Sequence, residues 1–124
     1  MLVVHNPTAG RGRRRLLDET LSRLRSAGHR LTVRDTVRRD HVRCLVSDAA
    51  AFDRIVVAGG DGTINEAVNA LMRLDERPPL GIVPVGTSNV LAAELAVPPK
   101  APALAAMLAD GARCRVALGQ VNGR

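Results

Sequence analysis

An uninterrupted apolar run that ends in a cluster of glycines is the strongest constraint on the fold of this chain. Residues 55–58 read Ile-Val-Val-Ala and lead directly into Gly59-Gly60-Asp61-Gly62. A strand without a polar position must be covered on both faces, which is typical of central strands in parallel sheets. The run therefore indicates a central strand with a glycine-rich loop at its carboxyl end.

The rest of the chain alternates between short apolar runs and segments in which apolar residues recur at helical spacing. This alternation predicts an α/β fold with a doubly wound, mostly parallel sheet flanked by helices. In such sheets, ligands bind beyond the carboxyl ends of the strands. The expected strands cover residues 2–4, 31–34, 55–58, 80–83 and 113–118, and the expected helices cover residues 12–27, 42–49, 64–74, 90–96 and 103–109.

Length and composition narrow the class of protein. The chain has 124 residues, which suffices for one compact core. It contains no apolar run near the roughly 20 residues of a transmembrane helix and no signal-peptide pattern, so we expect a cytoplasmic protein. It has one Phe and neither Tyr nor Trp, which argues against the aromatic platforms that bind single-stranded nucleic acid. We expect no nucleic-acid partner.

The basic charge is concentrated in the first half of the chain. The net charge is +6, and residues 1–62 carry 12 basic against 7 acidic side chains. Lys100 is the only lysine of the chain, so nearly all of the basic charge is carried by arginines, whose guanidinium groups suit bidentate contact with phosphate. A nucleotide, a nucleic acid or an anionic lipid surface would match this charge, and a solvated arginine-rich surface is the alternative. Cys44 and Cys114 lie far apart in apolar contexts, so we expect them to be small core residues rather than zinc ligands.

A first candidate loop follows the first strand and reads Asn6-Pro7-Thr8-Ala9-Gly10. Its small residues let backbone N–H groups approach an anion, and the following helix presents its positive end there. The arginines that come next, Arg11, Arg13 and Arg14, could reach phosphoryl oxygens. An ordinary strand-to-helix turn with solvated arginines explains the same residues.

The second loop runs from Gly59 through Asp61 to Glu66 and places one carboxylate among three glycines. The open backbone lets a nucleotide pack closely, and the carboxylate can hold Mg²⁺ on phosphates or accept a proton. Thr63 and Glu66 also have the spacing of a helix capping box. Capping leaves the glycines unexplained, so function is the favoured interpretation.

The third loop holds Thr87, Ser88 and Asn89 after the strand of residues 80–83. Its hydroxyls could hold an adenine, ribose or phosphate, although N-capping by Thr87 or Ser88 explains them equally well. Two common nucleotide signatures are absent, because the chain has neither GxxxxGK[ST] nor an intact GxGxxG.

Together, the segments NPTAG, GGDGTINEAVNAL and GIVPVGTSNVLA resemble the diacylglycerol kinase catalytic domain family, which includes YegS-like lipid kinases and has sphingosine kinases as relatives. The resemblance spans nearly the whole chain. It implies ATP-dependent phosphorylation of a lipid alcohol, diacylglycerol-like, at a membrane surface, with ATP and Mg²⁺ as cofactors and a peripheral membrane position. NAD kinases share GGDGT, but they are not expected to continue with Asn65-Glu66.

The resemblance also implies roles for residues at matching positions. Asp61 would be the catalytic carboxylate and would hold Mg²⁺ through bound ATP, and an arginine among Arg11, Arg13 and Arg14 would steady the transferred phosphoryl group. The implied nucleotide-binding residues are Asn6, Pro7, Thr8, Ala9, Gly10, Thr36, Gly59, Gly60, Asp61, Gly62, Thr63, Ile64, Asn65, Glu66, Thr87 and Asn89.

The chain departs from the family pattern in two ways. Val90 stands where family members usually carry an acidic residue, and the chain is shorter than such kinases, which have a second, mostly β domain. We expect residues 1–118 to form the nucleotide-binding domain and residues 119–124 to begin the crossing to a second domain. An exposed apolar face there predicts self-association. A non-catalytic nucleotide-binding remnant and an NAD kinase remain alternatives.

Overall fold

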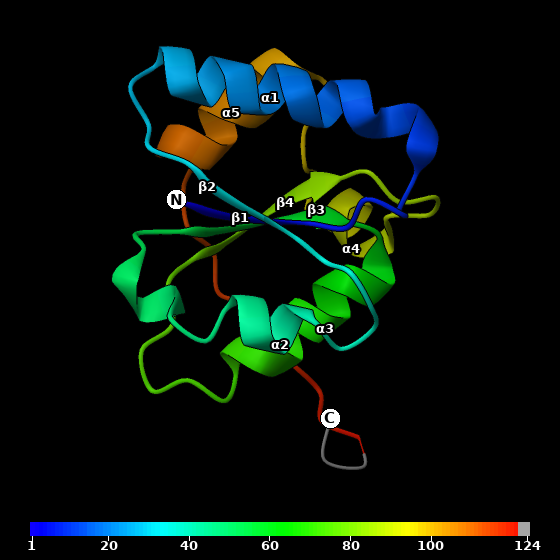
Figure 1. The fold of residues 1–124 in the computed structure, drawn as a ribbon, viewed down its shortest axis with the longest axis vertical. Helices are drawn as coiled ribbons and strands as arrows, with labels where there is room; N and C mark the ends of the chain where they lie inside the picture. The colour runs from blue at the N-terminus through cyan, green and yellow to red at the C-terminus, as the bar shows by residue number, and fades with distance from the viewer. Residues whose placement is uncertain (122–124) are drawn as a thin grey trace.

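A computed structural model describes residues 1–121, apart from the side chain of Arg11. Its centre is a four-stranded parallel sheet in the order β2-β1-β3-β4 (Figure 1). The strands are β1 (Leu2–His5), β2 (Thr32–Asp35), β3 (Ile55–Gly59) and β4 (Leu80–Pro84). Every residue of β1 and β3 is buried, whereas β2 is mostly exposed at the sheet edge, as the apolar patterns predicted.

Helices cover both faces of this sheet. They are α1 (Arg14–Ser26), α2 (Val42–Leu45), α3 (Asp61–Leu71), α4 (Val90–Glu94) and α5 (Ala101–Asp110), with single 3₁₀ turns at η1 (Arg11–Arg13) and η2 (Ala49–Ala51). Figure 1 shows α1 and α5 on one face, and α2 and α3 on the other. The predicted doubly wound α/β class is therefore confirmed.

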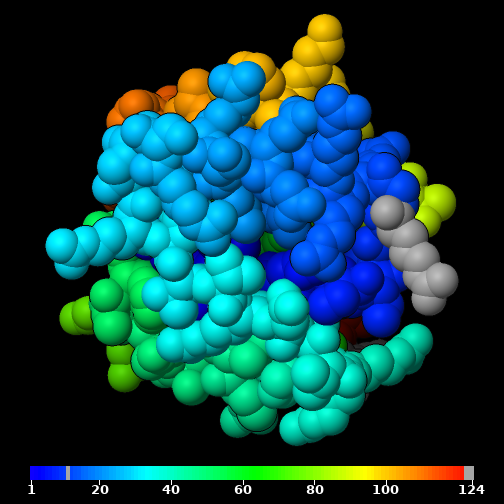
Figure 2. Space-filling view, turned by 45° about the horizontal axis from the view of Figure 1, so that its top comes forward, coloured from blue at the N-terminus to red at the C-terminus, as the bar shows by residue number. Residues whose placement is uncertain are grey.

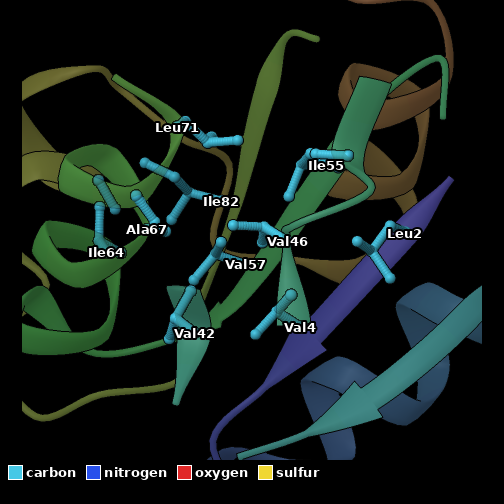
Figure 3. Close-up of a cluster of buried hydrophobic side chains, with 13 residues drawn as sticks. Leu2, Val4, Val42, Val46, Ile55, Val57, Ile64, Ala67, Leu71 and Ile82 are labelled. Carbon is cyan, nitrogen blue, oxygen red and sulfur yellow. The ribbon is translucent and has the colours of Figure 1, made fainter. Parts of the chain in front are cut away.

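The pleat of the strands divides the core into two apolar clusters. Successive side chains of a strand point to opposite faces, so Val4 and Val57 pack towards α2 and α3, whereas Val3 and Val56 pack towards α1 and α5. Figure 3 shows the first cluster, in which Ile64 of α3 lies among side chains from the strands and α2. These buried contacts hold the strand ends, and hence the loops that follow them, in fixed positions.

The segment between β2 and α3 is also anchored to the sheet edge. Arg34 of β2 donates hydrogen bonds to both carboxylate oxygens of Asp48, at 2.6 and 2.9 Å, and to the carbonyl oxygen of Leu45 at 2.6 Å. The hydrogen bonds between the two side chains raise the pKa of Arg34 and lower the pKa of Asp48. This fork of bonds fixes the carboxyl end of α2 beside β2.

Two expectations from the sequence are wrong. Residues 113–118 form no strand, because their backbone has no ladder partner and their alternating side chains lie exposed in the chain that follows α5. Cys44 and Cys114 are both exposed rather than in the core. Cys44 lies on the outer side of α2, whose Val42 points inward, and Cys114 belongs to that exposed segment.

Other expectations are shifted or stay predictions. The helix expected over residues 42–49 divides into α2 and η2. Residues 119–121 are exposed, and the remainder of the predicted crossing, residues 122–124, lies outside the described residues. Val116, Leu118 and Val121 are exposed apolar side chains near that end, and self-association through them stays a prediction. Within the described residues, none of the helices has the length and apolar character needed to span a bilayer.

Candidate functional site

The three candidate loops meet at the carboxyl edge of the sheet and border one cleft of about 1010 Å³. The first loop follows β1, the second joins β3 to α3, and the third follows β4. In Figure 2 the cyan surface of the segment after β2 lies beside the dark blue surface of the N-terminal segment. The predicted residues that line this cleft are Asn6, Thr8, Ala9, Gly10, Thr36, Gly60, Gly62, Thr63, Asn65, Glu66 and Thr87.

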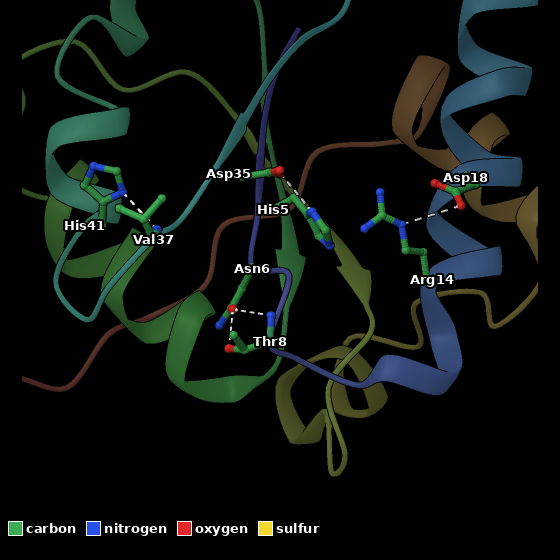
Figure 4. A network of polar contacts seen from close by, with 8 residues as sticks. All are labelled: His5, Asn6, Thr8, Arg14, Asp18, Asp35, Val37 and His41. Carbon is green, nitrogen blue, oxygen red and sulfur yellow. Dashed lines mark hydrogen bonds and ion pairs between the residues drawn. The ribbon is translucent and has the colours of Figure 1, made fainter.

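The first loop is held by its own asparagine. Asn6 Oδ1 accepts hydrogen bonds from the backbone N–H of Thr8 at 3.0 Å and from its hydroxyl at 2.8 Å, which closes an Asx turn (Figure 4). Asn6 Nδ2 donates to Thr63 Oγ1 at 3.0 Å, which ties this loop to the first turns of α3. At the end of β1, His5 Nδ1 lies 2.9 Å from Asp35 Oδ1 of β2. The loop is therefore rigidly placed relative to its neighbours.

Glycines let the loops approach one another closely. Gly10 has φ +51, and a Cβ placed on it would lie 1.5 Å from the carbonyl oxygen of Val85. A Cβ on Gly86 would lie 2.3 Å from the Cα of Gly60, so the second and third loops touch backbone to backbone. A side chain at either position would push the loops apart, which explains the glycines at the floor of the cleft.

The capping interpretations of Thr63 and Glu66 are wrong. The helix α3 begins at Asp61 with Gly60 as its N-cap, and no side chain caps it. Thr63 instead bonds to Asn6, and the Glu66 carboxylate accepts hydrogen bonds from the backbone N–H groups of Asp40 and Val42. Both side chains therefore link α3 to other segments around the cleft.

Capping by Thr87 or Ser88 is wrong as well. Asn89 occupies the N-cap of α4 in the left-handed conformation, with φ 53, and its Nδ2 donates to the carbonyl oxygen of Gly86 at 2.7 Å. Its Oδ1 is buried and has no hydrogen-bond partner within the described residues. A buried acceptor of this kind is costly unless a donor reaches it, and it lies beside the Gly60–Gly86 contact.

Asp61 lies at the first turn of α3 and is half-buried. Its Oδ1 accepts a hydrogen bond from the backbone N–H of Leu91 at 3.4 Å, so its carboxylate is turned towards α4 rather than into the lining of the cleft. The side chain lies near the positive end of the α3 dipole. Asp61 is thus an anionic group at the junction of the second and third loops.

The remaining predicted residues are not in the lining of the cleft. Gly59 and Ile64 are buried, and Pro7 is exposed on the first loop. Arg13 Nη1 donates to the carbonyl oxygen of Pro84 at 3.4 Å, and Arg14 faces Asp18 on α1 at 3.8 Å (Figure 4). The side chain of Arg11 lies outside the described residues. Phosphate contact by these three arginines stays a prediction.

Sequence reasoning missed four arginines that do line the cleft. Arg38 and Arg39 lie on the segment between β2 and α2, Arg43 lies on α2, and Arg73 follows α3. Gly86, Asn69 and Asp40 also line the cleft and were not among the predicted site residues. Arg38 and Arg39 follow Thr36 closely in the sequence, so they could have been predicted as phosphate contacts together with it. Arg73 lies too far along the chain for the sequence alone to place it at the same cleft.

The fold and the site define a class: an open parallel α/β domain with a glycine-floored cleft at the carboxyl edge of its sheet. The family model described as diacylglycerol kinase catalytic domain matches residues 1–121. The chain therefore belongs to the diacylglycerol kinase catalytic domain family, which confirms the predicted resemblance.

Relatives and solved structures agree with this assignment. The chain is 39% identical over 126 residues to a diacylglycerol kinase of Bacillus subtilis (strain 168), covering 98% of this chain and 42% of that protein. It is 32% identical over 128 residues to one of Staphylococcus epidermidis, covering 98% and 40%. A crystal structure of a diacylglycerol kinase from Bacillus anthracis str. Sterne is similar with a TM-score of 0.74 and 34% identity, covering 84% of this chain and 37% of that one. The chain thus spans about two fifths of the length of these curated relatives.

Proposed function

We propose that this chain supplies the nucleotide-binding part of an ATP-dependent lipid kinase, which transfers the γ-phosphoryl group of ATP to a lipid alcohol. The observation that carries the proposal is the cleft itself, because one cavity unites segments from all three candidate loops. The family membership supports phosphoryl transfer as the reaction. The names of the relatives support diacylglycerol or a similar lipid alcohol as the acceptor.

The residues around the cleft fit a nucleotide with its phosphates. A Cβ on Gly62 would meet nothing within 4 Å, so the backbone at the start of α3 is open to a ligand. Asn6, Thr8 and Thr87 line the same cavity. Among them, the Thr87 hydroxyl has no hydrogen-bond partner within the described residues and can bond to a ribose or phosphate oxygen.

Asp61 is the proposed catalytic carboxylate and the residue that would hold Mg²⁺ through bound ATP. Its carboxylate accepts the Leu91 N–H in this structure and would turn from α4 into the cleft to do so. When bound, Mg²⁺ neutralises charge on the phosphates during transfer. The described residues contain no group of three or more His, Cys, Asp and Glu side chains arranged to hold a metal ion. Asp61 would contribute one carboxylate to the ion, beside oxygen atoms of the nucleotide.

A lipid acceptor would require the kinase to work at a membrane surface, so we propose a peripheral position there. Since the chain spans about two fifths of its relatives, we propose that residues 1–118 bind the nucleotide and that another part of the protein contributes to lipid binding. Transfer of labelled phosphate from ATP to diacylglycerol by the kinase tests the reaction. Formation of NADP from NAD would favour the NAD kinase alternative, and nucleotide binding without transfer to either would favour a non-catalytic domain.

We expect Asp61→Asn to weaken binding of ATP about tenfold in the presence of Mg²⁺, because loss of one charge-assisted contact to a bound ion costs about 1.5 kcal/mol or more. Isothermal titration of ATP into the 124-residue chain, with Mg²⁺ and then with EDTA, measures this effect. In EDTA the variant should bind ATP at least as well as the wild type, since a repelling carboxylate is gone. Equal weakening in both conditions would contradict a role through Mg²⁺.

A second variant separates stability from binding. Gly62→Ala should raise the free energy of unfolding by about 0.5–1 kcal/mol, because alanine is the better helix former and its Cβ meets no protein atom. The same methyl group would occupy the cleft and should weaken ATP binding. Gly12→Ala is the matched control, because its Cβ also meets nothing and Gly12 does not line the cleft. Unchanged ATP binding by Gly62→Ala would place the nucleotide elsewhere.

A further inference from the structure

Four arginines from outside the three loops line the cleft. Arg38 and Arg39 come from the segment after β2, Arg43 comes from α2 and Arg73 comes from the turn after α3. All four side chains are exposed. These residues, the arginine wall, therefore present several positive charges to the same cavity that the glycine-rich loops border.

The charges of the arginine wall are free to meet a ligand. Among the described residues, Arg14, Arg15 and Arg34 each pair with a carboxylate, whereas no ion pair or side-chain hydrogen bond forms at the arginine wall. Two acidic residues, Asp40 and Glu66, also line the cleft. The Glu66 carboxylate already accepts the backbone N–H groups of Asp40 and Val42, so it is not turned towards an arginine.

The same carboxylate holds the segment that carries Arg38 and Arg39. Asp40 adopts the left-handed conformation with φ 56, which is uncommon for a residue with a side chain. Its N–H donates to Glu66 of α3, and the N–H of Val37 donates to His41 Nδ1 at 3.3 Å. These two hydrogen bonds hold the backbone on both sides of Arg38 and Arg39, so less conformational entropy is lost when the two arginines bind a ligand.

We propose that the arginine wall is the subsite that binds the polyphosphate chain of the nucleotide, in place of the arginines that follow the first loop. Guanidinium groups pair with phosphate oxygens through paired N–H donors. The glycine-rich floor lies across the same cavity and leaves backbone open to the phosphates. The concave shape of the cleft suits a small polyanion better than the flat surface of a bilayer. This inference rests on the proposed function.

The test compares two double variants with equal loss of charge. R38Q/R39Q removes two arginines of the wall, and R23Q/R25Q removes two exposed arginines of α1, on the opposite face of the sheet. Isothermal titration measures binding of ATP with Mg²⁺ and of inorganic tripolyphosphate to each 124-residue chain. We expect R38Q/R39Q to weaken both ligands about tenfold or more, and R23Q/R25Q to change them less than twofold. R43Q/R73Q, which removes the other two arginines of the wall, should weaken both ligands to a similar extent.

The outcomes distinguish this inference from the proposed function. ATP binding that both double variants leave intact would overturn the subsite and keep the nucleotide site. Equal weakening by R23Q/R25Q would show a general effect of charge and would also overturn the subsite. If the wild type binds tripolyphosphate but not ATP, and R38Q/R39Q abolishes that binding, the subsite stands and the proposed function fails.

Anionic vesicles provide the remaining arm of the test. If R38Q/R39Q loses sedimentation with phosphatidylglycerol vesicles but still binds tripolyphosphate as the wild type does, the arginine wall contacts lipid headgroups and the proposal is overturned. Loss of tripolyphosphate binding with unchanged vesicle binding supports it. Raising the salt concentration should weaken tripolyphosphate binding more steeply for the wild type than for R38Q/R39Q, because salt screens exposed charges.

Discussion

Gly10→Ala should destabilise the fold by about 3 kcal/mol and remove ATP binding. Gly10 has φ +51, and its Cβ would stand 1.5 Å from the carbonyl oxygen of Val85, a backbone atom that cannot rotate away. The first loop would have to leave the third loop, and the cleft between them would open. Urea unfolding of the 124-residue chain measures the free energy, and titration with ATP and Mg²⁺ measures the site.

Gly28→Ala is the matched control for Gly10→Ala. Gly28 also has a positive φ, of +90, but a Cβ there meets nothing within 4 Å. Its substitution therefore carries the conformational cost of about 1 kcal/mol without the collision, and it should leave ATP binding unchanged because Gly28 does not line the cleft. If the two variants lose the same free energy of unfolding, the collision with Val85 does not contribute to the effect of Gly10→Ala.

Gly86→Ala should cost about 2–3 kcal/mol in the free energy of unfolding, for packing reasons alone. Its Cβ would lie 2.3 Å from the Cα and 3.0 Å from the backbone nitrogen of Gly60, and 2.9 Å from Asn89 Oδ1. The second and third loops would be forced apart at the floor of the cleft, so ATP binding should fall with stability. Urea unfolding and the same titration measure both effects.

Alanine at the other glycine of this contact, Gly60, provides an internal comparison. A Cβ on Gly60 would lie 3.2 Å from the Cα of Gly86, a contact that a shift of a few tenths of an ångström relieves. Gly60→Ala should therefore destabilise the chain clearly less than Gly86→Ala does. If the two variants lose the same stability, the asymmetric approach of these loops is not what makes Gly86 necessary.

Much of the fold was predictable from local pattern. The apolar run over residues 55–58 specified the buried β3, and the alternation around Val33 specified an edge strand. The predictions that failed depended on contacts with another part of the chain, which the local pattern does not show. The alternation over residues 113–118 matches a strand, but a strand forms only where another strand offers its backbone groups. Cys44 shows the same limit, because apolar neighbours in sequence do not determine which side of a short helix faces the core.

The candidate site was predictable in its loops but not in its charges. Glycines and polar residues at strand ends carry a recognisable sequence signature, so Asn6, Thr63 and Thr87 were expected at the cleft that they line. Their hydrogen bonds were not expected. Glu66 had the spacing of a capping residue, yet it binds the backbone of residues 40 and 42, which the packing of α2 against α3 brings within reach.

By itself, the sequence determined the order of the four strands and the helices up to α5, the class of the sheet and the loops that border the site, because burial periodicity and turn chemistry are local properties. Only the tertiary structure decided which arginines face the cleft. Arg38 and Arg73 are brought to one cavity by the parallel strand order and by the packing of α2 against α3. Arg14 follows the first loop in sequence but pairs with Asp18 on α1. Side chains from distant segments converge through packing of whole elements, and no local pattern records that convergence.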